Sequence, residues 1–161
     1  MVAGSIKSEH LLSVSIDRVW KAVAFDGYNL VPKVVPDFIS SIELSEGDGG
    51  LGTVLKINFT DAVEKFRIAK ERIEEIDPEK HAIKYTIFEG WHIGLTLKSY
   101  SIEVKFEEVN SSETLVKLNL EHDTIENTPL VVEEEEEIMK DYVLMLKAIE
   151  GYLIENPTSY V

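Results

Sequence analysis

Three side chains with hydrogen-bonding chemistry fall on segments whose neighbours are apolar. Glu71 lies in a strand-like run, where alternation places it on the same side as Ala69 and Ile73. Tyr100 and Tyr142 occupy the apolar faces of another strand-like run and of a long helical one. A carboxyl group on such a face is unfavourable unless it meets a cation, stays protonated or accepts a hydrogen bond from a ligand. Glu71 is therefore either a ligand-binding residue or one end of a salt bridge to a neighbouring strand.

Metal and cofactor chemistry has little support in the sequence. The chain has no cysteine, which excludes thiol nucleophiles and cysteine metal sites. The histidines His10, His81, His92 and His122 are scattered without paired spacing, so we expect surface or turn positions for them. The glutamate run at 133–137 falls in the first turns of the long helical segment, where the helix dipole favours negative charge. We therefore predict no metal site and no cofactor.

A glycine-rich loop at 47–53 could suggest a phosphate site. A phosphate cradle lies between a strand and a helix and usually has a lysine directly after its glycines. Here another strand-like run follows, and the next lysine is Lys56. We interpret the loop as a tight connection that needs positive backbone angles, supplied by its glycines Gly47, Gly49, Gly50 and Gly52.

Length, composition and charge limit the class of protein. The 161 residues, 44% of them hydrophobic, suit one α+β domain spanning 1–161. No window approaches the ~20 apolar residues of a membrane span, and the first residues do not resemble a signal peptide, so we expect a cytoplasmic protein without a membrane partner. The formal net charge of -14, without a cluster of Lys or Arg, disfavours nucleic acid as a partner. We expect a monomer or a weak dimer.

Periodicity predicts an antiparallel sheet and one long helix. The strand-like runs alternate between apolar and polar residues, which indicates one buried face. Asp17 is expected to cap a first short helix that Gly27 ends, and a second covers 28–34. A long amphipathic helix is predicted over 129–154. The predicted strands cover residues 5–14, 38–44, 54–59, 66–76, 83–88, 95–106 and 114–122.

Four sequence segments together resemble the plant pathogenesis-related class 10 proteins, the family of the major birch pollen allergen. The resemblance spans essentially the whole chain. It implies a helix-grip fold, in which a seven-stranded curved antiparallel sheet wraps around a long C-terminal helix and two short helices close a large apolar cavity. The segments are FDGYNLVPKVVP at 25–36, EGDGGLGT at 46–53, KYTIFEG at 84–90 and AIEGYL at 148–153.

The resemblance also implies which residues face the cavity, although ordinary core packing is the alternative for each aliphatic one. Trp91 and His92 depart from the glycine-rich run usual at their position, and we hypothesise that they narrow one entrance. The residues implied as ligand contacts are Tyr28, Val31, Leu55, Ile57, Phe59, Ala69, Glu71, Ile83, Tyr85, Ile87, Tyr100, Ile102, Val104, Ile138, Tyr142 and Met145.

The expected function is binding or storage of small hydrophobic or amphipathic ligands by a plant defence-related protein. Cytokinins and other phytohormones, flavonoids, phenolics and fatty acids are the ligand classes that the resemblance implies. Cytokinin-binding members carry a glutamate at the position of Glu71, although acidic residues are common there across the family.

Catalysis is the alternative function, either as an alkaloid-type condensation enzyme or as a weak ribonuclease. For the ribonuclease, Glu150 and Tyr152 have counterparts in the family, but Lys98 stands where a glutamate is frequent. For the condensation enzyme, strand alternation would put Lys98 on the side of Thr96 and Tyr100, near the cavity mouth. We prefer a solvent-facing Lys98 and expect no catalysis.

Overall fold

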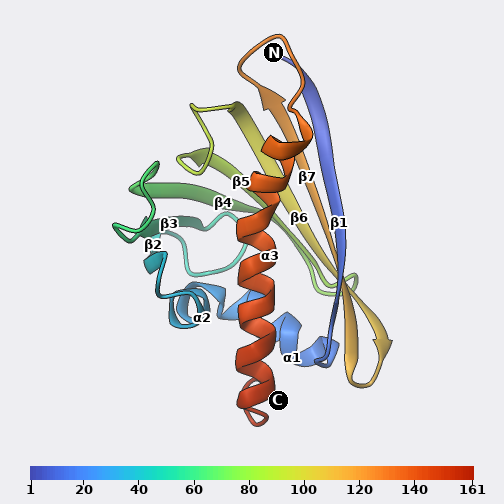
Figure 1. Ribbon diagram of the computed structural model, residues 1–161. Helices are drawn as coiled ribbons and strands as arrows, with labels where there is room; N and C mark the ends of the chain where they lie inside the picture. Colours follow the sequence, from blue (N-terminus) through green and yellow to red (C-terminus); the bar gives the residue numbers. More distant parts are fainter.

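Seven strands and three helical regions make up the computed structural model, which describes residues 1–161 (Figure 1). The predicted strand at 54–59 agrees with the structure residue for residue, and the other predicted strands are displaced by only a few residues at their ends. The elements are β1 (Ala3–Leu12), α1 (Ile16–Trp20), η1 (Lys21–Phe25), α2 (Gly27–Val34), β2 (Ile39–Glu46), β3 (Val54–Phe59), β4 (Ile68–Asp77), β5 (Ala82–Glu89), β6 (Leu97–Asn110), β7 (Glu113–Thr124) and α3 (Val132–Glu155).

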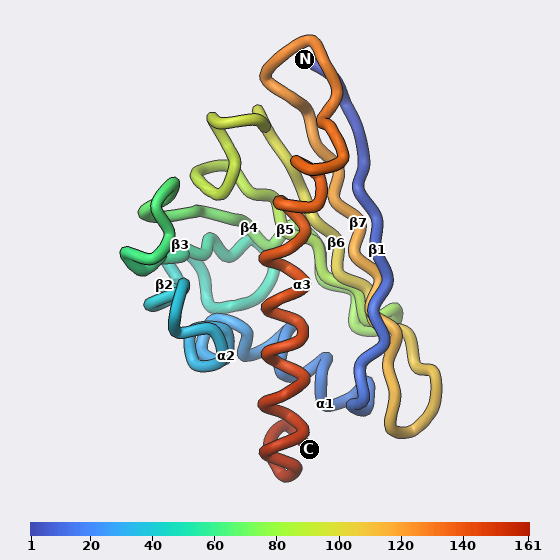
Figure 2. Tube along the Cα trace, viewed as in Figure 1, coloured from blue at the N-terminus to red at the C-terminus, as the bar shows by residue number.

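The sheet is antiparallel throughout and has the strand order β1-β7-β6-β5-β4-β3-β2. Its end strands β1 and β2 do not pair with each other, so the sheet is strongly curved but not closed. Helix α3 crosses the concave face, and α1 and α2 lie beside its C-terminal half (Figures 1 and 2). None of the helices combines the length and apolar character that crossing a bilayer requires.

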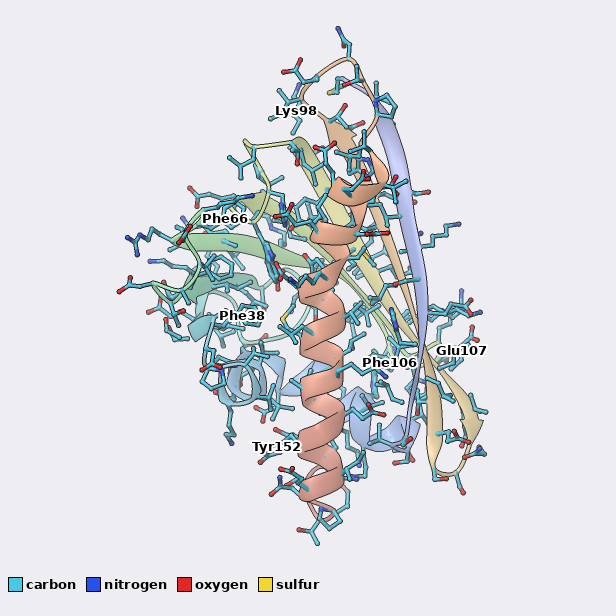
Figure 3. All side chains as sticks on the ribbon, viewed as in Figure 1. Phe38, Phe66, Lys98, Phe106, Glu107 and Tyr152 are labelled. Carbon is cyan, nitrogen blue, oxygen red and sulfur yellow. The ribbon has the colours of Figure 1, made fainter.

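Strand β6 shows why the chain folds into these two layers. Tyr100, Ile102, Val104 and Phe106 are buried, as alternation predicts, and Phe106 points toward α3 (Figure 3). Glu107 lies on the other side of the sheet, with its carboxylate oxygen 3.1 Å from Nζ of a lysine on β7. Burying the apolar face of the sheet against the apolar stripe of α3 removes both from water, which supplies the main driving force for this arrangement.

The first helical region differs from the prediction at both ends. Helix α1 begins at Ile16 with Ser15 at the capping position, so Asp17 lies in the first turn and is not the cap. Gly27 does not end this region, because the backbone continues from Trp20 into the π turn η1, and the φ of −136° at Asp26 interrupts the helix instead. Gly27 is then the first residue of α2.

Helix α1 holds the C-terminal end of the chain through one side chain. The Arg18 guanidinium donates to the backbone carbonyls of Leu153 and Asn156, both at 2.8 Å, and to that of Ser159 at 3.0 Å. The last carbonyls of a helix have no partners within it and carry partial negative charge, so a cation placed there is favourable. Arg18 thereby fixes the end of α3 against the first helix.

Candidate ligand-binding cavity

A cavity lies between the concave face of the sheet, η1, α2 and α3. It offers a volume of about 110 Å³ to the centre of a water-sized sphere, and 18 of its 21 lining residues are hydrophobic. One water needs only about 10–15 Å³ by this measure, so the space suits a small organic molecule. The lining residues are Val23, Ala24, Gly27, Tyr28, Val31, Ile39, Ile42, Gly49, Leu55, Ile57, Glu71, Ile73, Tyr85, Trp91, Ile102, Val104, Leu118, Tyr142, Met145, Leu146 and Ile149.

Glu71 is the only acidic or basic amino acid, tyrosines aside, among the lining residues. Strand β4 pairs it with Leu55 of β3 and Ile87 of β5, so its carboxyl group emerges among apolar neighbours. The residue is only 8% exposed, and its side chain forms neither an ion pair nor a hydrogen bond with the protein. Desolvation raises its pKa from 4.5 to about 8. Of the possibilities left open by the sequence, the structure thus shows no salt bridge and favours a protonated carboxyl at pH 7.

Two buried tyrosines, Tyr100 and Tyr142, and the half-buried Tyr85 surround this part of the cavity, and their hydroxyl groups differ in hydrogen bonding. The Tyr100 and Tyr142 hydroxyl oxygens are 3.2 Å apart and hydrogen-bond to each other. The Tyr85 hydroxyl, on the cavity wall, has no partner in the protein. Burial raises the pKa of all three well above the usual value, and the nearby Glu71 carboxylate adds to the effect. Glu71 and Tyr85, together with Tyr28 of α2, are therefore the wall residues whose side chains have free hydrogen-bonding capacity toward a ligand.

Trp91 forms a further part of the wall, from the loop between β5 and β6. Its indole is stacked on the Tyr142 ring, with the ring centroids 4.9 Å apart and the planes 18° from parallel. The indole Nε1 donates to Asp141 Oδ2 at 3.3 Å, and the Phe59 ring is nearly perpendicular to the indole, with the ring centroids 5.6 Å apart. Trp91 is 2% exposed and has a φ of 47°. These contacts hold the loop against α3 although its backbone lies in the left-handed region.

Two histidines are buried: His92 lies in a turn, as expected, and His122 departs from the expected surface or turn positions. His92, in the same loop as Trp91, is buried with its Nε2 unpartnered, and the Phe66 ring lies against it at 5.3 Å. His122 is buried on β7, with Nδ1 unpartnered, because it lies on the inward face of the sheet. Burial lowers the pKa of both. Neither lines the cavity, and the structure contains no group of acidic and histidine side chains placed to hold a metal ion.

The residues implied as ligand contacts divide into two groups. The inward face of the sheet is larger than the cavity, so some inward side chains pack against helices or aromatic rings and not against open space. The wall includes Tyr28, Val31, Leu55, Ile57, Glu71, Tyr85, Ile102, Val104, Tyr142 and Met145. The structure places Phe59, Ala69, Ile83, Ile87, Tyr100 and Ile138 in the packed core, away from the cavity.

Sequence reasoning missed part of the wall. Leu118, Leu146 and Ile149 lie on faces whose apolar periodicity is clear, so that signal could have found them. Trp91 carried no periodic signal because it lies in a turn. The π turn η1 likewise has no pattern that predicts its inward residues, Val23 and Ala24.

The glycine loop serves the wall through its backbone. Gly47, Gly49 and Gly52 have positive φ, as predicted, whereas Gly50 does not. The Gly49 amide donates to Oγ1 of Thr53 at 2.9 Å, which pins the loop, and Gly49 itself lines the cavity.

Lys98 does not reach the cavity mouth. The register of β6 against β7 shifts between Leu97 and Ser99, so simple alternation fails at this point. Leu97 and Tyr100 are both buried, and Lys98 between them is exposed. Figure 3 shows Lys98 near the end of the sheet, away from α2 and the C-terminal half of α3. The preferred solvent-facing position is therefore the one observed.

Known proteins of similar sequence and structure define the family. The model of the pathogenesis-related protein Bet v 1 family matches residues 1–156. Pathogenesis-related protein 1 of Asparagus officinalis is 34% identical over 161 residues, which cover 100% of both chains. Major allergen Pru av 1 of Prunus avium is 33% identical over 96% of each chain.

The fold comparison agrees with the sequence comparison. The crystal structure of Ara h 8.0201 has a TM-score of 0.82 and 28% identity, covering 96% of this chain and 99% of the other. Norcoclaurine synthase from Thalictrum flavum shares the fold, with a TM-score of 0.75 at 23% identity over 96% of this chain and 88% of its own. The chain described here is a member of the pathogenesis-related protein Bet v 1 family.

Proposed function

We propose that this protein binds, and so stores or carries, small apolar or amphipathic molecules in the cytoplasm of the plant cell. Members of the Bet v 1 family bind small hydrophobic ligands. The observation that carries the proposal is a cavity with 18 hydrophobic residues among 21, to which only the side chains of Glu71, Tyr85 and Tyr28 offer free hydrogen-bonding groups.

The apolar wall supplies most of the binding free energy in this proposal. Burying 100 Å² of apolar ligand surface contributes about 2.5 kcal/mol, at about 25 cal/mol per Å². The aliphatic residues of β3 and α3 that line the cavity have no directional preference, so many ligand shapes can gain this energy. Specificity must come from the few polar groups.

Glu71 and Tyr85 would orient the ligand. They lie on the adjacent strands β4 and β5, on the same side of the sheet. A ligand that offers an N–H or O–H group to Glu71 would satisfy a carboxyl group that otherwise has no partner. Cytokinins, flavonoids and other phenolics have such groups on an apolar frame, whereas fatty acids offer only a carboxylate.

Condensation catalysis gains no support from the position of Lys98. The solved norcoclaurine synthase with dopamine and hydroxybenzaldehyde shares the fold, but the residues that line the cavity here include no lysine. We therefore retain binding as the proposed function.

A competition titration tests the proposal. N-phenyl-1-naphthylamine, a neutral fluorescent probe, is bound and then displaced by a cytokinin, a flavonoid, a fatty acid and an alkaloid precursor. We expect micromolar displacement by the cytokinin and weaker displacement in Glu71→Gln, but not in the control Glu75→Gln, an exposed glutamate on the same strand. Equal displacement in the wild type and in Glu71→Gln would mean that the cavity binds apolar molecules without orientation by Glu71. Absence of probe binding would overturn the proposal.

A further inference from the structure

The cavity wall has one acidic residue and no basic one. Glu71 is the only aspartate or glutamate that lines the cavity, and no lysine, arginine or histidine lines it. The carboxyl group has no cation to balance it within the protein, and desolvation is the one cause of its shifted titration. A buried carboxylate without a counter-ion is costly, and a cationic ligand would supply the missing charge.

Aromatic rings line the same cavity. Tyr28, Tyr85, Trp91 and Tyr142 come from α2, β5, the β5–β6 loop and α3 respectively. The faces of tryptophan and tyrosine rings attract cations, and the attraction is greater when water is excluded. The wall thus combines one unpaired carboxyl group with four rings, and it has no group that would neutralise an anion.

From this arrangement we propose that the cavity selects organic cations, namely aryl- or alkylamines whose ammonium group meets Glu71, over neutral and anionic molecules of the same shape. The inference rests on the proposed function, because it concerns which ligands the same cavity takes. The net charge of -14 acts in the same direction, since it draws cations to the protein from solution.

Binding of a cation to Glu71 has a proton signature. With a pKa of about 8, the free carboxyl is mostly protonated at pH 7. Forming an ammonium–carboxylate pair then moves that proton to the buffer, so close to one proton leaves per amine bound. Affinity should rise about tenfold per pH unit below pH 8 and level off above it.

Other titrating groups do not produce the same signature. Tyr85, Tyr100 and Tyr142, on elements next to Glu71, have pKa values raised above the usual value, mainly by burial. Asp141 does not line the cavity. Its charge contributes to the raised pKa of Tyr100 and Tyr142, and its carboxylate accepts a hydrogen bond from the Trp91 indole. Burial lowers the pKa of His92, which follows the wall residue Trp91 in the chain, and Glu71→Gln retains this histidine as an internal control. An alkylammonium ligand keeps its charge up to a pH of about 10.

Three compounds of nearly equal size test the selection. Phenethylamine, 2-phenylethanol and 3-phenylpropionate are cationic, neutral and anionic at pH 7, and each is titrated against the protein loaded with N-phenyl-1-naphthylamine. We expect phenethylamine to displace the probe at least tenfold better than the alcohol, and the alcohol better than the acid. Calorimetry in two buffers of different ionisation enthalpy should report close to one proton released for the amine and none for the alcohol.

Two variants assign the effect to the proposed groups. Glu71→Gln should lower phenethylamine affinity at least tenfold, abolish its proton release and change 2-phenylethanol affinity less than threefold. Glu75→Gln, the exposed control, should change none of these. Equal displacement by all three compounds, or a Glu71→Gln variant that keeps the preference for the amine, would overturn the selection while leaving cavity binding intact. Failure of the probe itself to bind would instead overturn the proposed function.

Discussion

The Trp91 indole lies almost parallel to the Tyr142 ring, with 4.9 Å between the ring centroids. This stacked pair joins the β5–β6 loop to α3 at the cavity wall. Trp91 and His92 both have positive φ, so the loop keeps a backbone that side chains disfavour, and the contacts of Trp91 compensate. The pair thus places two aromatic side chains of the cavity wall, one from the loop and one from the helix, in direct contact.

Replacing Trp91 with glycine should speed ligand exchange. Glycine tolerates the φ of 47°, so the backbone can keep its course while the indole is lost. We expect both association and dissociation of N-phenyl-1-naphthylamine to be at least several-fold faster in stopped-flow fluorescence. Leu95→Ala, an exposed change in the same loop, is the control. Unchanged rates in Trp91→Gly would show that the indole does not restrict entry.

Glu71→Gln should stabilise the protein, and more so at higher pH. The folded pKa of about 8 exceeds the unfolded value of 4.5, so the unfolded state loses its proton first as the pH rises. The wild type therefore loses stability between these two pH values, and the glutamine variant does not. At 1.36 kcal/mol per unit, the advantage of the variant grows from under about 1 kcal/mol at pH 5 to about 3 kcal/mol at pH 7.

Urea unfolding at several pH values checks this result. Glu75→Gln should give a free energy of unfolding that differs from the wild type by a small constant amount at every pH, because the side chain is exposed. Parallel curves for wild type and Glu71→Gln would mean that the carboxyl is hydrated in the cavity and titrates normally.

Tyr142→Phe should destabilise the fold by about 1–3 kcal/mol, because it leaves the buried Tyr100 hydroxyl without a partner. Removing both hydroxyls, in Tyr100→Phe combined with Tyr142→Phe, should cost less than the sum of the single changes. A double-mutant cycle by urea unfolding measures the difference. Tyr28→Phe, whose hydroxyl has no protein partner, is the control. Simple additivity would contradict a direct hydrogen bond.

Gly90 and Gly151 should respond oppositely to alanine. A Cβ at Gly90 would lie 2.0 Å from the Ile68 carbonyl oxygen, and its φ is 68°, so Gly90→Ala should lower stability by more than about 4 kcal/mol or prevent folding. Gly151 lies within α3 with nothing within 4 Å of an added Cβ, so Gly151→Ala should raise stability by about 1 kcal/mol. Thermal unfolding distinguishes the two, and similar effects would refute the packing argument.

Periodicity predicted most of the fold because each strand has one dry face. It failed where the backbone departs from regular geometry. Simple alternation alone would put Lys98 on the side of Tyr100, but a register shift in β6 lets Leu97 and Tyr100 both face inward, and Lys98 has the preferred solvent-facing position. The π turn η1 was not foreseen, since one extra residue per turn leaves no distinct hydrophobic pattern.

The cavity could be predicted in kind but not in outline. Alternation predicted which side chains face inward. Whether an inward side chain lines the cavity or packs against other side chains depends on how the helices and loops fill the concave face. Tyr100 is inward but packed, because its hydroxyl meets Tyr142. Trp91 fills space that its position in a turn does not reveal. Such distances depend on tertiary packing, which no local pattern records.

The three hydrogen bonds from Arg18 hold α3 at its C-terminal end. Its C-terminal carbonyls are held by the guanidinium, whereas its first turns carry a run of glutamates whose one ion pair is the exposed contact between Lys65 and Glu137. Any lifting of α3 from the sheet would therefore pivot near Leu153 and be widest toward Val132. Such a tilt would widen the space over the concave face without breaking any strand pairing of the sheet.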